Sequence, residues 1–202
     1  SVPRMRPIER LCVYCGSSLG TDPVFAEAAA ALGELIVAEG LTLVYGGASV
    51  GLMGVLADTV LAAGGEVIGV IPSWLVESEI AHPGLSELHV VETMQERKRL
   101  MAELSDAFVA LPGGFGTLEE LFEAVTASQV GLHTKPTGLL EVGDFFDSLL
   151  AFLDHAVAVG VLRAENRRLL LTASSPRALL DRLRSWPGRV DQLTPGTPGR
   201  RG

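Results

Sequence analysis

The chain has 202 residues, of which 48% are hydrophobic, and it carries a formal net charge of −8. This length supports one substantial hydrophobic core and does not require a second domain. The acidic balance argues against a general binder of nucleic acid or anionic membrane, because such partners need a basic surface. No apolar run approaches the ~20 residues that span a bilayer, and residues 1–9 lack the apolar core of a signal peptide, so we expect a cytoplasmic protein.

Strand, glycine turn and helix recur along the first third of the chain. The first predicted strand covers residues 11–14, and its helix covers residues 23–39. Two further strands are predicted at residues 41–45 and 66–71, with a helix over residues 52–63 between them. This repetition predicts an open parallel α/β sheet, whose ligands lie outside the carboxyl ends of the strands.

The pattern lapses at residues 73–88, which are either a flap at the ligand edge or a plain connection. The remaining strands and helices are then predicted at residues 89–91, 94–104, 108–111, 118–130, 137–140, 144–159, 169–171 and 176–185. We therefore expect an extension over residues 1–10 and a single α/β domain over residues 11–186. Proline, glycine and arginine without a period predict a disordered tail over residues 187–202.

A glycine-rich turn, PGGFGTLEE at residues 112–120, joins a buried strand to a helix. Such a turn aims backbone N–H groups and the positive end of a helix dipole at one point, which favours an anion, most often a phosphate. Glu119, Glu120 and Glu123 follow within two helical turns, which is unusual for an anion site. The turn lacks the lysine of a Walker A loop, and the earlier turns lack the three-glycine dinucleotide fingerprint.

Arg97 is out of place on its predicted helix. At 100° per residue, the apolar side of that helix is formed by Met94, Leu100, Met101 and Leu104, and Arg97 falls in its middle. A buried guanidinium is costly unless an anion meets it. We expect its partner to be a bound phosphate or a catalytic glutamate; the alternative is a structural carboxylate.

The helix predicted over residues 118–130 has apolar residues on two sides. One stripe faces the sheet, yet the far side carries Ala124, Ala127 and Val130. Because the sheet covers only one stripe, a second subunit is the simplest cover for the other. We therefore expect a homodimer with its site near this helix.

The remaining candidates for special chemistry are read as structural. Cys12 and Cys15 lie three apart in and just after a strand, so they point to opposite faces and are expected to be buried thiols. The four histidines lack metal-ligand spacing, and no metal is indicated.

Several blocks of the sequence, in order along the chain, carry a family resemblance. They are VYCGSS (residues 13–18), YGGASVGLMG (45–54), ERKRLM (96–101) with PGGFGTLEE (112–120), GLHTKPTGLL (131–140) and FFDSLLAFLDHAV (145–157). Together they resemble the LOG (Lonely Guy) family of cytokinin riboside 5′-monophosphate phosphoribohydrolases. The resemblance covers nearly the whole chain before the tail.

This resemblance implies a Rossmann-like open parallel sheet with helices on both faces, commonly in a dimer and without a cofactor. It also implies hydrolysis of the N-glycosidic bond of AMP or an N6-prenylated AMP, which releases the free base and ribose 5-phosphate in cytokinin biosynthesis. The positions that contact substrate in the family map onto Glu79, Arg97, Lys98, Gly113, Gly114, Phe115, Gly116, Thr117, Leu118, Glu119, Glu120 and Thr126.

The expected chemistry assigns catalytic roles to Arg97 and Glu120. A base that leaves ribose develops positive charge on the sugar, and a carboxylate near the anomeric carbon stabilises that charge and positions water. We assign this carboxylate to Glu120, with Glu119 as the alternative. Arg97 is expected to sit against the 5′-phosphate or to orient the glutamate.

Two rival functions remain open at this point. A pyridoxal-phosphate lysine decarboxylase needs a Schiff-base lysine, and neither Lys98 nor Lys135 has a recognisable cofactor context. A non-catalytic nucleotide or cofactor carrier of Rossmann-like fold could use similar glycine turns. The presence of Arg97 together with Glu120 favours the enzyme.

Overall fold

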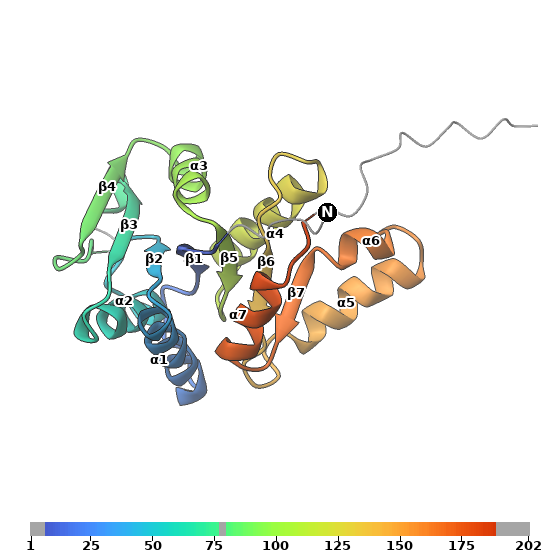
Figure 1. Cartoon of the computed structure of the whole chain (residues 1–202), viewed down its shortest axis with the longest axis horizontal. Helices are drawn as coiled ribbons and strands as arrows, with labels where there is room; N and C mark the ends of the chain where they lie inside the picture. Colours follow the sequence, from blue (N-terminus) through green and yellow to red (C-terminus); the bar gives the residue numbers. More distant parts are fainter. Residues whose placement is uncertain (1–6, 77–79, 189–202) are drawn as a thin grey trace, which may run out of the picture.

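The computed structural model describes residues 7–76 and 80–188. Within these residues, seven parallel strands form one sheet in the order β4-β3-β2-β1-β5-β6-β7 (Figure 1). The strands are β1 (Arg10–Tyr14), β2 (Thr42–Tyr45), β3 (Val67–Pro72), β4 (Glu87–Val91), β5 (Ala107–Ala110), β6 (Thr137–Leu140) and β7 (Leu170–Ala173). The predicted open parallel sheet is confirmed.

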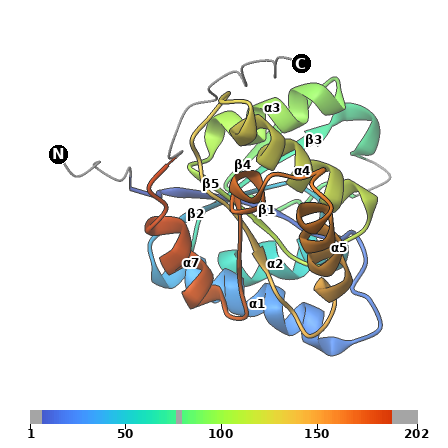
Figure 2. The ribbon, with the colours of Figure 1, turned by 90° about the vertical axis from the view of Figure 1, so that its right-hand side faces the viewer.

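Helices cover both faces of this sheet, as predicted. They are α1 (Pro23–Ala38), α2 (Gly51–Ala62), α3 (Met94–Leu104), α4 (Phe115–Gln129), α5 (Asp147–Ala158), α6 (Ala164–Arg167) and α7 (Pro176–Arg184), with a 3-10 turn η1 (Ser73–Leu75) after β3. Helices α1, α2 and α7 pack on one face, and α3, α4 and α5 pack on the other. Figure 2 shows α3 and α4 on the opposite side of the strands from α1 and α2.

The strands that form the centre of the sheet are continuous apolar runs, because helices bury them from both sides. All residues of β3 and β5 are buried. Alternate residues of β1 then face different cores: Val13 packs with α1 and α2, while Cys12 packs with α3 and α4. Both cysteines are buried free thiols, as expected.

Strand order reverses between β1 and β5, which is where an open α/β sheet leaves a crevice for ligands. The turn after β1 and the PGGFGT turn after β5 meet at this point. The Gly16 amide donates to the carbonyl of Pro112 at 3.0 Å, and the Leu52 amide donates to the carbonyl of Gly16 at 3.0 Å. The glycine turns therefore gather at one edge of the sheet, as the sequence predicts.

Some boundaries differ from the prediction. Helix α4 begins at Phe115 and not at Leu118, because the Leu118 amide donates to the carbonyl of Gly114 and draws the last part of the glycine turn into the helix. Strand β1 begins at Arg10, and the preceding Ile8 is buried in the core. The domain limits remain a prediction, since residues 1–6 and most of the predicted tail, 189–202, lie outside the described residues.

The irregular segment after β3 is attached to the second glycine turn. The amide and the hydroxyl of Ser49 both donate to the carbonyl of Ile80, and the His82 amide donates to the carbonyl of Gly47. His82 Nε2 also lies 2.8 Å from a carboxylate oxygen of Asp58 on α2. These contacts describe an anchored connection around the glycine turn. No helix among the described residues is long and apolar enough to cross a membrane.

Candidate functional site

The turn after β5 presents backbone N–H groups at the start of α4. Its N-cap is Gly114, which has no side chain to accept from the first amides, whereas Asp22 and Thr93 cap α1 and α3 with their own side chains. The first amides of a helix have no partner within the helix and carry the positive end of its dipole. The amides of residues 115–117 are therefore suited to an anion.

Close packing explains why this turn needs glycine. A Cβ atom on Gly113 would lie 2.1 Å from the hydroxyl oxygen of Thr117 and 2.9 Å from the amide nitrogen of Gly16. A Cβ atom on Gly16 would lie 3.2 Å from the Cα atom of Gly113. The two turns thus pack backbone against backbone, which holds the amides at the start of α4 in a fixed position.

Arg97 reaches the same edge of the sheet from α3. Its side chain is buried, with 5% exposure, as its place on the apolar side of the helix predicts. Its Nε donates to the carbonyl of Val70 at 3.0 Å, and Nη2 donates to the carbonyl of Gly46 at 2.6 Å. These two carbonyls, which lie at β3 and just after β2, hold the guanidinium in place.

Gly46 makes room for that guanidinium. A Cβ atom at this position would lie 2.3 Å from Nη2 of Arg97 and 3.2 Å from the sulfur of Met53. The glycine turn after β2 therefore admits an arginine side chain of the same chain.

A cavity of about 420 Å³ joins these features. Of the predicted site residues, it is lined by Arg97, Gly114, Phe115, Gly116, Thr117, Glu119 and Glu120. Tyr14, Ser17, Gly46, Met53, Trp74, Leu75 and Met94 also line it, although sequence reasoning did not select them. The residues at the start of α4, the buried arginine and two carboxylates therefore share one space.

Five predicted contacts remain, and one of them, Lys98, lines a second cavity that is described below. Gly113 and Leu118 flank the turn without lining this cavity, and Glu79 lies outside the described residues. Thr126 is exposed on the outer face of α4, where it lines a shallow groove with Phe122 and other apolar residues. Within one copy of the chain, Thr126 thus faces a different space from Arg97.

Lys98 bridges α3 and α4. Its ammonium group donates to one carboxylate oxygen of Glu119 and one of Glu123, and its side chain is 12% exposed. Burial of the amine lowers the pKa of Lys98, but the hydrogen bonds to Glu119 and Glu123 outweigh burial and raise it above its usual value. Lys98 is therefore a charged link between two helices.

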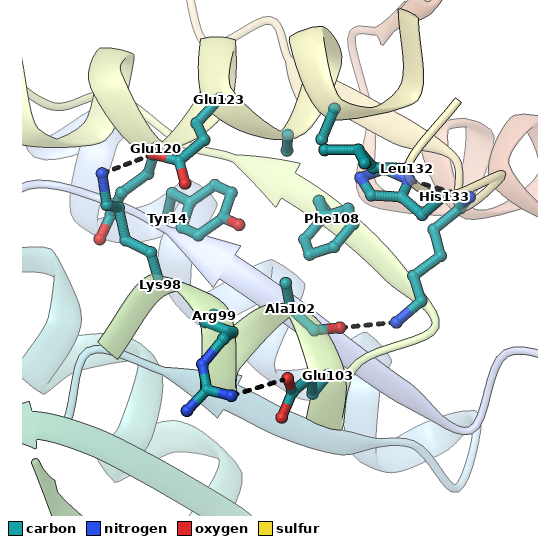
Figure 3. A pocket seen from close by; sticks show the side chains of 13 residues that line it. Tyr14, Lys98, Arg99, Ala102, Glu103, Phe108, Glu120, Glu123, Leu132 and His133 are labelled. Carbon is teal, nitrogen blue, oxygen red and sulfur yellow. Dashed lines mark hydrogen bonds and ion pairs between the residues drawn. The ribbon is translucent and has the colours of Figure 1, made fainter. Parts of the chain in front are cut away.

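Behind this bridge lies a second cavity of about 330 Å³ between α3 and α4 (Figure 3). Aromatic rings line it: Tyr14 and Phe108 are nearly parallel with centroids 6.0 Å apart, and His133 lies 5.4 Å from Phe108. Tyr14 and Glu120 line both cavities, so the two spaces adjoin at these side chains.

Burial shifts the pKa of two groups that line the second cavity, Tyr14 and His133. Burial raises the pKa of Tyr14 well above its usual value, and the nearby Cys12 and Glu120 raise it further. Burial lowers the pKa of His133, and the charge of Lys135 adds to that effect. The Lys135 ammonium itself donates to the carbonyl of Ala102 at 2.6 Å, which ties the end of α3 to the loop before β6.

Comparison with known proteins identifies the family. A family profile described as "Possible lysine decarboxylase" matches residues 53–183. The probable cytokinin riboside 5′-monophosphate phosphoribohydrolase LOGL1 of Oryza sativa subsp. japonica is 46% identical over 98% of this chain and 88% of its own length. The cytokinin riboside 5′-monophosphate phosphoribohydrolase LOG7 of Arabidopsis thaliana is 45% identical over 92% of this chain and 86% of its own length. This chain belongs to the LOG family.

A solved structure shares the LOG fold at lower identity. The molybdenum cofactor binding protein from Rippkaea orientalis is 26% identical, covers 90% of this chain and 98% of its own, and has a TM-score of 0.67.

The profile's description as a lysine decarboxylase finds little support in the residues of this LOG chain. Pyridoxal-phosphate chemistry needs a lysine amine that forms a Schiff base. Lys98, one of two lysines in the sequence, is held between two carboxylates that keep it charged, and Lys135 is bonded to a carbonyl at the end of α3. Neither amine lines the cavity that contains Arg97. The residues present do not fit this cofactor.

Proposed function

We propose that this LOG-family chain is a phosphoribohydrolase that cleaves the N-glycosidic bond of a nucleoside 5′-monophosphate, AMP or an N6-prenylated AMP. The observation that carries this proposal is the shared cavity, in which Arg97 and Glu120 lie with the amides at the start of α4. The names of the curated relatives, at 44–46% identity, support the same reaction. The products are the free base and ribose 5-phosphate.

In the proposed reaction, the 5′-phosphate binds at the amides of residues 114–117. Water then attacks C1′ of ribose: a carbon–oxygen bond forms, the bond from C1′ to the base nitrogen breaks, and the base leaves with that electron pair and takes up a proton. Positive charge develops on the sugar during this step, and a carboxylate beside C1′ stabilises it and orients the water. We assign this carboxylate to Glu120.

Arg97 and Glu119 have supporting roles in this scheme. Two carbonyls fix the guanidinium of Arg97 at the cavity, where it favours the negatively charged part of the nucleotide. Glu119 shares the ammonium group of Lys98 with Glu123. A carboxylate already engaged in this ion pair is a weaker partner for a sugar cation, which is why Glu120 is preferred.

The decisive assay measures base release from AMP and from N6-isopentenyl-AMP by chromatography. Glu120→Gln removes the negative charge with little change in size, so we expect base release to fall by at least 10²-fold while the protein stays folded. Glu27→Gln, an exposed carboxylate of α1, is the matched control. Wild-type turnover in Glu120→Gln would remove this residue from the mechanism.

A nucleotide or cofactor carrier is the alternative. The solved molybdenum cofactor binding protein favours it, because it shares the fold and most of the chain length. The higher identity to proteins named as phosphoribohydrolases favours the enzyme. Tight binding of AMP with no base released from either nucleotide would support the carrier.

The cytoplasmic location expected from the sequence stays a prediction. We also propose that the chain acts as a homodimer through the outer face of α4. Ala124 was one of the residues that suggested a second subunit, but it is buried within its own chain. Val130 is 52% exposed and Leu132 is 79% exposed beside the groove that contains Thr126. Contact through this groove would place Thr126 against a second copy. A monomeric mass by light scattering at micromolar concentration would contradict the dimer.

A further inference from the structure

A tryptophan side chain lies at the rim of the cavity that holds Arg97 and Glu120. Trp74 belongs to the short turn η1, which follows directly on the last residue of β3, so its position is set by the carboxyl edge of the sheet. Its indole lines the cavity and is 60% exposed. A large apolar side chain left open to water beside a binding cavity is typical of a recognition site.

The lining of the cavity has two chemical characters. One part is polar and includes Ser17, Arg97, the backbone of the turn at residues 114–117, Glu119 and Glu120. The other part is apolar and includes Met53, Trp74, Leu75 and Met94, with Phe115 on the turn itself. A ligand that fits both parts has an anionic end and a flat apolar end. A nucleoside 5′-monophosphate has this construction, with its phosphate and its base at opposite ends.

We propose that Trp74 recognises the base of the nucleotide by packing its indole against the purine ring. This inference rests on the proposed function, because it takes the ligand to be a nucleoside 5′-monophosphate. The role is one of specificity: Trp74 contacts the part of the substrate that leaves, and the phosphate and sugar are held elsewhere. An apolar N6 substituent adds surface that the indole and its apolar neighbours can cover.

The segment that carries the indole is held on both sides. Before it, Pro72 pairs with Val91 of β4. Within it, the Val76 amide donates to the carbonyl of Ser73 at 3.3 Å, and the Ala81 amide donates to the carbonyl of Val76 at 3.1 Å. A contact platform fixed in this way loses little conformational freedom when a base binds.

The first test compares ligands with and without a base. Stacking of a base on an aromatic ring accounts for roughly 5- to 150-fold in affinity. We therefore expect Trp74→Ala to weaken binding of AMP and N6-isopentenyl-AMP within this range, while affinity for ribose 5-phosphate changes less than about twofold. In turnover, KM should rise with kcat nearly unchanged, and Trp74→Phe should restore most of the loss. Phe152→Ala, which removes an exposed aromatic ring from α5, is the control.

The second test uses fluorescence, because the sequence contains only two tryptophans, Trp74 and Trp186. Trp186→Phe leaves the indole of Trp74 as the single reporter. We expect AMP and N6-isopentenyl-AMP to change its emission, and ribose 5-phosphate to leave it nearly unchanged. An emission that does not respond to either nucleotide at saturating concentration would overturn the inference.

Further outcomes separate the inference from the proposed function. If the wild-type protein binds AMP through Trp74 but releases no base, base recognition stands and hydrolysis fails. If the wild-type protein releases base and Trp74→Ala does so with unchanged KM, hydrolysis stands and the inference is wrong. Equal loss of affinity for AMP and ribose 5-phosphate, or a changed mass by light scattering, would show that Trp74 supports the fold or a contact between copies instead.

Discussion

Replacing Gly46 with alanine is expected to displace the guanidinium of Arg97 and leave the sheet in place. The backbone of Gly46 is not in the left-handed region, so alanine can adopt its conformation. The new Cβ atom would lie 2.3 Å from Nη2 of Arg97, whereas such contacts are rarely shorter than 3.0 Å. Nη2 must therefore retreat by about 1 Å, since the backbone on the other side is buried.

Two effects set the magnitude. The bond from Nη2 to the carbonyl of Gly46 is 2.6 Å long, and hydrogen bonds that involve a charged group contribute about 1.5–3 kcal/mol to stability. The bond from Nε to the carbonyl of Val70 can persist, so we expect the free energy of unfolding to fall by about 1–3 kcal/mol. A group misplaced by about 1 Å costs on the order of 10²-fold in rate, which is the loss in kcat/KM that we expect for base release.

The assay is steady-state base release from AMP, paired with urea unfolding of the same preparation. Gly84→Ala is the matched control: its Cβ atom would lie 3.4 Å from the nearest atom of His82, which is an ordinary contact, and it carries the same change in chain entropy. A folded Gly46→Ala protein with the kcat/KM of the wild type would refute the reasoning, because the position of Arg97 would then not matter for the reaction.

Three further predictions test other groups. Lys98→Met removes both ion pairs between α3 and α4, so it should lower the free energy of unfolding in urea titrations by about 0.5–2 kcal/mol. In 1 M NaCl the difference in stability from wild type should become smaller. An equal difference with and without salt would contradict an ionic bridge. Burial raises the pKa of both Cys12 and Cys15, so neither thiol should react with a thiol reagent at pH 8 in the folded protein. Both thiols should react once urea has unfolded the chain. Labelling of the native protein would disprove their burial. Burial lowers the pKa of His133, so as the pH drops below about 6.5 the unfolded chain binds a proton before the folded one does, and stability should fall. In urea titrations at pH 7.5 and 5.5, His133→Asn should reduce this loss of stability, and the exposed His155→Asn is the control. If His133→Asn loses as much stability as wild type, other groups cause the pH dependence.

The fold was predictable from the sequence because its strongest signals are local. Buried parallel strands are continuous apolar runs, and β1, β2 and β5 are each followed by a glycine turn, so strands and turns were placed within a few residues. The start of α4 was missed by three residues because Gly114 and Gly116 have low helix propensity, whereas the hydrogen bond from Leu118 to Gly114 extends the helix through them. The short helix α6 was missed because its four residues show no helical period.

The site was predictable only where its residues stand in a motif or violate a pattern. The glycine turn has a recognisable chemistry, and Arg97 stands out because a charge lies on an apolar helix face. Lys98 gave no such signal, since its ion pairs join α3 to α4 and depend on how the two helices pack. Trp74 lies in a segment without a period, where sequence alone does not distinguish a ligand contact from a connection.

The glycine turns of this sheet look alike in sequence but serve two purposes. Those after β1 and β5 pack against each other, and the second of them places the start of α4 at the edge of the sheet, where we propose that a phosphate binds. The turn after β2 instead admits the guanidinium of Arg97, a cation from within the same chain. One edge of the sheet thereby offers positive charge from two sources, a helix N-terminus and a buried arginine. For the proposed reaction, this local positive charge would let a chain with a net charge of −8 hold a 5′-phosphate, and it would offset the negative charge of the three glutamates that follow the turn.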